Sequence, residues 1–244
     1  MLNKHFFYNI LIYIKISKNF TQNFHLSMIF TGLCSFFILS GCQSQTTLQQ
    51  QESYVFGTRV EISISQTKPE IAQQAITAAL HELDRLHRQL HPWQIDSELS
   101  QVNRAFQSGQ LITLSAELTE LIRHSQQFEQ LSDGLFNPAI GLLIREWGFQ
   151  QEHAAPAPPP AATLHALLSP PPSTQAIELN GNQAHSRQAR IALDFGGMAK
   201  GWALDRVAQI LHQHQVEHAL INIGGNILAM GQKAPKQPDR KSVV

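Results

Sequence analysis

The stretch ALDFGGMAKGWALD, residues 192–205, places an aspartate, two adjacent glycines and a Lys-Gly pair within eight residues. Because glycine has no Cβ, Gly196 and Gly197 let a ligand approach the backbone closely. A strand is expected to end near Asp194, and a helix to begin directly after the glycines. The free N–H groups of that helix and the charge of Lys200 predict a phosphate-binding turn. A tight turn without a ligand is the alternative, since the spacing matches neither a Walker loop nor a dinucleotide-binding fingerprint.

The composition excludes some classes of function. The chain has 244 residues with 18 basic and 18 acidic side chains, so its formal net charge is zero. This length is enough for one large domain or two small ones with a sizeable core. Without a basic excess there is no electrostatic support for nucleic-acid binding, and we expect no nucleic-acid partner.

The N-terminal segment has the features of a targeting sequence. Lysines precede an apolar run at 28–39, and the run ends in LSGC at 39–42. The run is shorter than the roughly 20 residues that a membrane-spanning helix needs, which disfavours that alternative. LSGC resembles a bacterial lipoprotein signal, in which cleavage falls before the cysteine and the cysteine carries the lipid. We therefore predict a signal peptide at 1–41, lipidation at Cys42 and a polar tether at 42–53; a translation start at Met28 is the alternative.

This interpretation predicts a lipid-anchored protein of the cell envelope, on the periplasmic face. Gln43 follows the cysteine, which resembles the outer-membrane sorting pattern of a Gram-negative host. Cys34 lies in the predicted signal peptide and Cys42 would be acylated. The mature chain is then expected to have neither a free thiol nor a disulfide.

Hydrophobic periodicity predicts the elements of the first part of the chain. Apolar and polar residues alternate over 55–64, which is typical of a strand with one buried face. Apolar residues recur every three or four positions over 71–90 and again over 118–128, which predicts two amphipathic helices. Ser115 is the expected N-cap of the second helix.

The second part of the chain continues with strands and a helix. The prolines at 154–173 predict an exposed connection around a short helix. A hairpin is expected over 177–193 around Asn-Gly-Asn, a helix over 200–212, and two short strands on either side of Gly-Gly-Asn at 224–226. This order of elements predicts the α+β class.

The ending DRKSVV, residues 239–244, does not suit a strand pattern that has just restarted. It matches the translation of a common sequencing adapter. We interpret these six residues as a sequencing artefact and expect the functional domain at 54–238 to be incomplete at its C-terminus.

Three further stretches give the opening motif a context. They are LHPWQIDSELSQVNRA at 90–105, SDGLFNPAIGLLIREWGF at 132–149 and INIGGNILAMG at 221–231. In this order and spacing, together with residues 192–205, they resemble the FAD:protein FMN transferases, the ApbE-type flavin transferases. The resemblance extends over about 56–231. It implies a two-lobed α+β fold with mixed sheets flanked by helices, and FAD bound between the lobes.

The resemblance also implies an activity. Members of this family bind FAD and Mg²⁺, transfer FMN to a threonine hydroxyl of an acceptor protein and release AMP. The acceptor expected here is a subunit of a membrane redox complex. Two alternatives stay open: a periplasmic lipoprotein that binds flavin without turnover, and a pyrophosphatase that splits FAD into FMN and AMP.

The same resemblance assigns site residues. Phe56 stands where relatives commonly have Met, and Asn137 stands where they usually have Asp. The backbone carbonyl of Gly197 matches a Mg²⁺ ligand, whereas the side-chain metal ligands and the catalytic residues are expected in the missing C-terminal part. The implied cofactor-binding residues are Phe56, Trp93, Leu135, Phe136, Asn137, Asp194 and Lys200.

Several aromatic and histidine side chains allow a purely structural interpretation. Trp93 could stack on the flavin or pack as a core residue after the helix. We interpret Trp147 and Phe149 as core side chains. His87 and His91 lie four residues apart on a predicted helix, but no third ligand is recognisable, so we place them on a helix surface rather than in a metal site.

Overall fold

The computed structural model describes residues 48–149 and 157–232. The predicted signal peptide, the lipidated Cys42 and the segment 239–244 lie outside these residues. Among the described helices, none is both long and apolar enough to cross a membrane.

A four-stranded antiparallel sheet contains both ends of the described chain. Its strand order is β1-β2-β6-β7. The strands are β1 (Gln49–Val55), β2 (Thr58–Ile64), β6 (Ala219–Ile223) and β7 (Asn226–Met230). Strands β2 and β6 are therefore neighbours although about 150 residues of sequence separate them. Their pairing closes a long loop of the chain.

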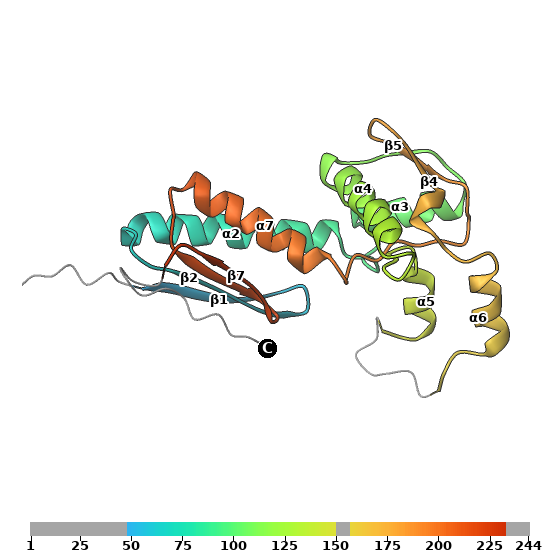
Figure 1. Cartoon of the computed structure of the whole chain (residues 1–244), viewed down its shortest axis with the longest axis horizontal. Helices are drawn as coiled ribbons and strands as arrows, with labels where there is room; N and C mark the ends of the chain where they lie inside the picture. The colour runs from blue at the N-terminus through green and yellow to red at the C-terminus, as the bar shows by residue number, and fades with distance from the viewer. Residues whose placement is uncertain (1–47, 150–156, 233–244) are drawn as a thin grey trace, which may run out of the picture. The chain divides into compact units, whose positions relative to one another are not determined.

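One face of this sheet is apolar and is covered by two long helices. Val60, Ile62 and Ile64 of β2 lie directly opposite apolar residues of β6, and all three are fully buried. Helices α2 (Pro69–Gln89) and α7 (Ala199–Gln213) lie along this face (Figure 1). Burial of these alternating side chains stabilises a two-layer arrangement, with the sheet in one layer and the two helices in the other.

The beginning of this sheet differs from the sequence prediction. Residues 49–53 form most of β1, although they were assigned to the tether. The segment 55–64 is not one strand, because Phe56 and Gly57 turn the chain with φ values of 54° and 67°. Two central residues with positive φ are typical of a type I′ hairpin. Strand β1 was missed because its mostly polar residues pair with β2 through the backbone.

A second sheet has the order β3-β5-β4, again antiparallel. Its strands are β3 (Ile112–Thr113), β4 (Ile177–Asn180) and β5 (Gln183–Ser186). The hairpin predicted around Asn-Gly-Asn is therefore confirmed. The class α+β is confirmed as well. The described strand pairs in both sheets are antiparallel rather than mixed, and the parallel pairing seen is an isolated bridge between Ile140 and Ala192.

Helices accompany this second sheet and enclose a second apolar cluster. Its largest fully buried side chains are Phe106 and Phe195. Trp202 of α7 packs against both this cluster and the first one. Helices α3 (Glu98–Gln107) and α4 (Ala116–Leu131) contribute side chains to this cluster. Helices α5 (Gly141–Glu146) and α6 (Ala161–Leu168) and the short 3₁₀ helix η1 (Thr174–Ala176) contribute none.

The predicted helices α2, α4 and α7 are confirmed, as are the short helix in the proline-rich segment and the strands β6 and β7. Ser115 caps α4, and its Oγ accepts a hydrogen bond from the backbone N–H of Leu118 at 3.2 Å. Helices α3 and α5 were not predicted. The strand expected to end near Asp194 is reduced to the single parallel bridge between Ala192 and Ile140.

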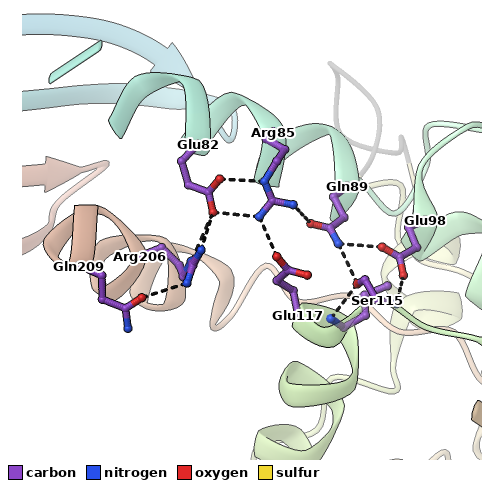
Figure 2. Close-up of polar contacts among 9 residues, drawn as sticks. Glu82, Arg85, Gln89, Glu98, Ser115, Glu117, Arg206 and Gln209 are labelled. Carbon is purple, nitrogen blue, oxygen red and sulfur yellow. Dashed lines mark hydrogen bonds and ion pairs between the residues drawn. The ribbon is translucent and has the colours of Figure 1, made fainter. Parts of the chain in front are cut away.

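A polar network joins α2 to three other helices (Figure 2). The Glu82 carboxylate accepts hydrogen bonds from Arg85 at 2.8 Å and from Arg206 of α7 at 3.2 Å. Arg85 also reaches Glu117 of α4 at 3.1 Å. The hydrogen bond from Arg85 is the largest cause that lowers the pKa of Glu82. The carboxylate therefore stays ionised between two guanidinium groups.

The network continues toward the start of α3. The Gln89 amide donates to the carboxylate of Glu98 at 2.7 Å and to the Ser115 hydroxyl at 2.9 Å. The other Glu98 oxygen accepts from the Ser115 backbone N–H at 2.6 Å. The C-terminal half of α2 is thereby tied to the N-termini of both α3 and α4 (Figure 2).

Candidate functional site

The chain before the glycine turn is held by backbone and side-chain hydrogen bonds. The Asp194 N–H donates to the Pro138 carbonyl at 2.9 Å, and the Ala192 carbonyl accepts from the Gly141 N–H at 2.7 Å. Asn103 of α3 donates to the Leu193 carbonyl at 2.9 Å and accepts from the Leu193 N–H at 2.6 Å. Its side-chain amide thus bonds the backbone as a paired strand would. Asn103 is only 6% exposed, so these bonds are shielded from water. Asn103 is not among the site residues predicted from the sequence, although it lies inside one of the matching stretches, 90–105.

The glycine turn itself is built around Asp194. One carboxylate oxygen of Asp194 accepts a hydrogen bond from the Gly196 N–H at 2.8 Å. A Cβ at Gly196 would lie 3.0 Å from that oxygen, so the turn favours glycine there. The N–H groups of Met198 and Ala199 bond to the Phe195 carbonyl and start α7. Among the described side chains, none caps α7, which leaves its positive end open toward a ligand.

A hollow of about 540 Å³ opens at this turn. One wall comes from the β1–β2 hairpin turn, a second from the end of α2 and the residues after it, and a third from the glycine turn and the start of α7. Four of the seven predicted cofactor residues line it. They are Phe56, Trp93, Asp194 and Lys200.

Two aromatic residues of the hollow, Phe56 and Trp93, lie outside the buried core. Phe56 occupies the left-handed region of the hairpin turn, an uncommon conformation for a side chain of this size. Its ring meets His87 edge to face, with centroids 5.6 Å apart. Trp93 is half-buried and lines the hollow. This placement favours the ligand-facing interpretation of Trp93 over the core interpretation.

The other three predicted residues do not line this hollow. Leu135 is 92% exposed. The Asn137 amide donates to the Pro172 carbonyl at 2.7 Å, and its oxygen accepts from the Ala139 N–H at 2.9 Å. Asn137 is therefore engaged as a turn residue, the alternative that its position before proline allows. The Phe136 ring packs edge to face against Phe128, with centroids 5.9 Å apart.

Two predictions about structural residues are wrong. Trp147 and Phe149 are 43% and 76% exposed, so neither is a core side chain. Phe149 instead lines the hollow. His87 and His91 are half-buried and line the hollow too, rather than lying on an open helix surface. Helical periodicity places residues on a face but cannot tell which neighbour covers that face, and this explains the error.

Burial and charge act together on His87. Burial is the largest cause that lowers its pKa, followed by the neighbouring His91. Arg88 lowers this pKa further, while Asp84 partly offsets the effect. The neutral imidazole is therefore favoured at this wall of the hollow.

A larger hollow of about 710 Å³ lies between α4 and α7. It is lined by Glu120, His124 and Phe128 on α4, and by Trp202 and Asp205 among others on α7. None of the predicted cofactor residues lines it. We therefore place the candidate site in the smaller hollow, where the predicted residues converge with an open helix N-terminus.

The described residues do not form a magnesium site by themselves. They contain no group of three or more histidine, cysteine, aspartate or glutamate side chains able to share a metal ion. Mg²⁺ demands octahedral oxygen ligands, which the Gly197 carbonyl alone cannot supply. The Asp194 carboxylate, the nearest acidic group to this glycine in sequence, already accepts the Gly196 N–H.

Comparison with known proteins identifies the family. The ApbE family matches residues 56–241. The chain belongs to the ApbE family. Among the relatives, the FAD:protein FMN transferase of Rhodobacter capsulatus is 29% identical over 178 residues, which are 73% of this chain and 34% of that protein. The enzyme of the same name from Klebsiella pneumoniae is 33% identical over 140 residues, which are 56% of this chain and 43% of that protein.

Solved structures share the ApbE fold. The apo form of the flavinyl transferase ApbE of Pseudomonas stutzeri matches with a TM-score of 0.73 and 23% identity, covering 82% of this chain and 66% of that one. The ApbE protein of Thermotoga maritima matches with a TM-score of 0.69 and 24% identity, covering 77% and 60%. The chain spans 34% to 63% of the length of the relatives from Rhodobacter capsulatus, Treponema pallidum and Vibrio cholerae.

Proposed function

We propose that this protein binds FAD in the smaller hollow and transfers its FMN half to a threonine hydroxyl of an acceptor protein, releasing AMP. The observation that carries the proposal is the convergence of Phe56, Trp93, Asp194 and Lys200 around one hollow at the open start of α7. The names of the relatives in the ApbE family give it further support.

The chemistry suits these residues. The threonine oxygen attacks the phosphorus of the FMN half, and the bond from that phosphorus to the bridging oxygen breaks. AMP leaves with the bridging oxygen, and the hydroxyl proton passes to solvent water. Such a displacement depends mainly on positioning and charge neutralisation. The positive end of α7 and the Lys200 ammonium would stabilise the pyrophosphate, and Trp93 offers a stacking surface for a flat ring.

Dependence on Mg²⁺ is part of the proposal. An Mg²⁺ ion bound to the phosphates would withdraw electron density from the breaking bond. Such an ion commonly keeps several waters and binds substrate phosphates, so the Gly197 carbonyl would be a single protein contribution. Further protein ligands would come from outside the described residues.

We further propose a site of action at the cell envelope. The lipoprotein-like signal at 1–41 and Cys42 supports a lipid anchor on the periplasmic face, in the outer membrane of a Gram-negative host. The acceptor would then be an extracytoplasmic subunit of a membrane redox complex. Replacement of Cys42 by serine should abolish labelling with a fatty-acid analogue.

A second candidate function is flavin binding without turnover. It requires only a site that holds the flavin, and Phe56, Trp93, Asp194 and Lys200 line one hollow. Incubation with FAD and Mg²⁺ together with envelope fractions of the host separates the candidates. Covalent flavin fluorescence on an acceptor together with AMP supports transfer. Free FMN with AMP indicates hydrolysis, and bound but intact FAD indicates a binding protein.

The Lys200→Ala variant should lower the affinity for FAD about tenfold, because one fixed charge beside the phosphates is lost. A titration that follows quenching of flavin fluorescence measures this change. The matched control is Lys68→Ala, which removes an exposed lysine from the start of α2, away from the hollow. Equal affinities of the Lys200→Ala variant and the wild type would remove Lys200 from the phosphate site.

A further inference from the structure

The two aromatic flanks of the hollow are joined by a continuous series of contacts. The Phe56 ring meets His87 edge to face at 5.6 Å between centroids. The His87 ring meets His91 at 5.4 Å, with an angle of 68° between the planes. His91 in turn lies two residues before Trp93. The histidine pair therefore occupies the wall between the Phe56 hairpin turn and the loop that carries Trp93.

His91 holds this loop through its ring. Its Nδ1 atom accepts hydrogen bonds from the backbone N–H groups of Trp93 at 3.3 Å and of Gln94 at 3.2 Å. A ring nitrogen that accepts cannot carry a proton, so the geometry places the proton of the neutral ring on Nε2. Nδ1 is therefore committed to the loop and is not free to bind a ligand.

The backbone on both sides of this contact is also braced. The His91 carbonyl accepts from the Ser97 hydroxyl at 2.5 Å, and the Pro92 carbonyl accepts from the Ser100 hydroxyl at 2.9 Å. Ser97 is the N-cap of α3, so these bonds tie the loop to the start of that helix. The Pro92 carbonyl and the Trp93 N–H belong to one planar peptide, so Ser100 and the His91 ring hold that peptide from its two sides. The Gln94 N–H, in the next peptide, bonds to the His91 ring and to neither serine.

We propose that His91 is a positioning residue that holds Trp93 in the wall of the hollow for stacking on the flavin ring. Nothing in the resemblance or in the comparisons assigns a role to His91. The proposal rests on the proposed function in one respect, namely that the flat ring bound beside Trp93 is that of FAD. Loss of the Nδ1 acceptor leaves two N–H groups without a partner, and the loop would rearrange to reach water.

Three variants test this role. His91→Leu removes the acceptor at similar size and should weaken FAD binding about tenfold, the scale of a lost stacking contact. His91→Asn keeps an acceptor oxygen one bond beyond Cγ, where Nδ1 lies, and should stay within about twofold of the wild type. His81→Leu, at an exposed histidine of α2, is the matched control and should change nothing. Unchanged FAD affinity in His91→Leu, or equal losses in the Leu and Asn variants, would overturn the proposal.

A double-mutant cycle with Trp93 distinguishes positioning from a direct effect of the ring. If His91 acts through Trp93, then His91→Leu in a Trp93→Ala background changes the FAD affinity by less than about twofold. Additive losses from the two substitutions would show that His91 acts on the ligand independently, and would contradict the proposal.

A measurement without flavin keeps the two proposals separate. The amide protons of Trp93 and Gln94 should exchange slowly with deuterium in the wild type and in His91→Asn, and rapidly in His91→Leu. The ¹⁵N signal of His91 Nδ1 should be of the unprotonated type. Fast exchange in the wild type, or a protonated Nδ1 in the neutral ring, would overturn the positioning role. Protected amides combined with a lack of FAD binding in the wild type would instead overturn the proposed function.

Discussion

The C-terminal half of α2 has two faces that differ in how their polar groups are used. On one face, Glu82, Arg85 and Gln89 find partners on α3, α4 and α7. On the other, His87, together with His91 just after the helix, faces a hollow that the glycine turn and Lys200 complete. The first set satisfies its charges within the protein, whereas the second presents aromatic and cationic groups to an open space. We therefore infer that the network stabilises the fold and that the hollow binds the ligand.

This contrast makes separable predictions. Changes in the network should alter the free energy of unfolding with little effect on FAD affinity, and changes in the hollow should do the reverse. Residues that serve both should affect both quantities.

Asn103→Leu is expected to have the largest effect, because Asn103 supports both the fold and the glycine turn. The change leaves the N–H and the carbonyl of Leu193 without their partner in a buried place, which should cost about 3 kcal/mol of unfolding free energy. FAD affinity should fall too, since Asp194 follows directly. Urea denaturation and flavin titration measure the two effects.

The control for Asn103 is Asn180→Leu, at an exposed position of β4. Its unfolding free energy should stay within about 0.5 kcal/mol of the wild type. If Asn103→Leu were as stable as this control, its two hydrogen bonds to Leu193 would not hold the turn.

Glu82→Ala should come next, with a loss of about 2 kcal/mol, because it leaves two guanidinium groups without their shared carboxylate. FAD affinity should be unchanged. Since the folded-state pKa of Glu82 lies below its usual value, the contribution to stability is present above the ordinary glutamate pKa of about 4.3 and is lost as pH falls through the folded value. Thermal or urea unfolding at neutral and acidic pH measures both aspects.

Glu52→Ala is the matched control for Glu82. Glu52 pairs with Arg59 on the sheet, and both side chains are more than half exposed, at 51% and 64%. Its removal should cost no more than about 0.5 kcal/mol. A Glu82→Ala variant that resembled this control in stability, or that lost FAD affinity, would break the distinction between network and hollow.

His87→Gln should have the smallest effect and should depend on pH. The folded-state pKa of His87 lies below its usual value, so protonation is resisted in the native state. The unfolded chain then takes up more protons as pH falls below the ordinary histidine pKa of about 6.5, and the native state loses stability. The variant lacks this penalty. Its free energy of unfolding, relative to that of the wild type, should therefore increase as the pH is lowered from 8 to 5. Denaturation curves that shift in parallel over this range would contradict it.

Local sequence patterns predicted much of the fold where the pattern and the burial coincide. Helix α2 was found because its buried alanines and leucines recur at helical spacing. Helix α3 was overlooked, although Leu99, Val102 and Phe106 share that spacing behind the N-cap Ser97. Strand β1 could not be found in this way, because its three glutamines, Glu52 and Ser53 carry no apolar alternation.

The candidate site was predicted in part. Trp93 and Lys200 line the same hollow as expected, but Leu135 and Asn137 do not. A motif tells which residues lie near one another in sequence. It does not show that the Asn137 amide donates a hydrogen bond to the Pro172 carbonyl, 35 residues away.

The sequence by itself determined the long helices, the Gly-Gly turns and the family to which the chain belongs, because these depend on local periodicity, local backbone freedom and motif order. Only the tertiary structure decided that His87, His91 and Phe149 face the hollow and that Asn103 bonds both backbone groups of Leu193. These features depend on which distant segments pack together. That choice is set by the burial of two apolar clusters across the whole chain, and no window of sequence contains it.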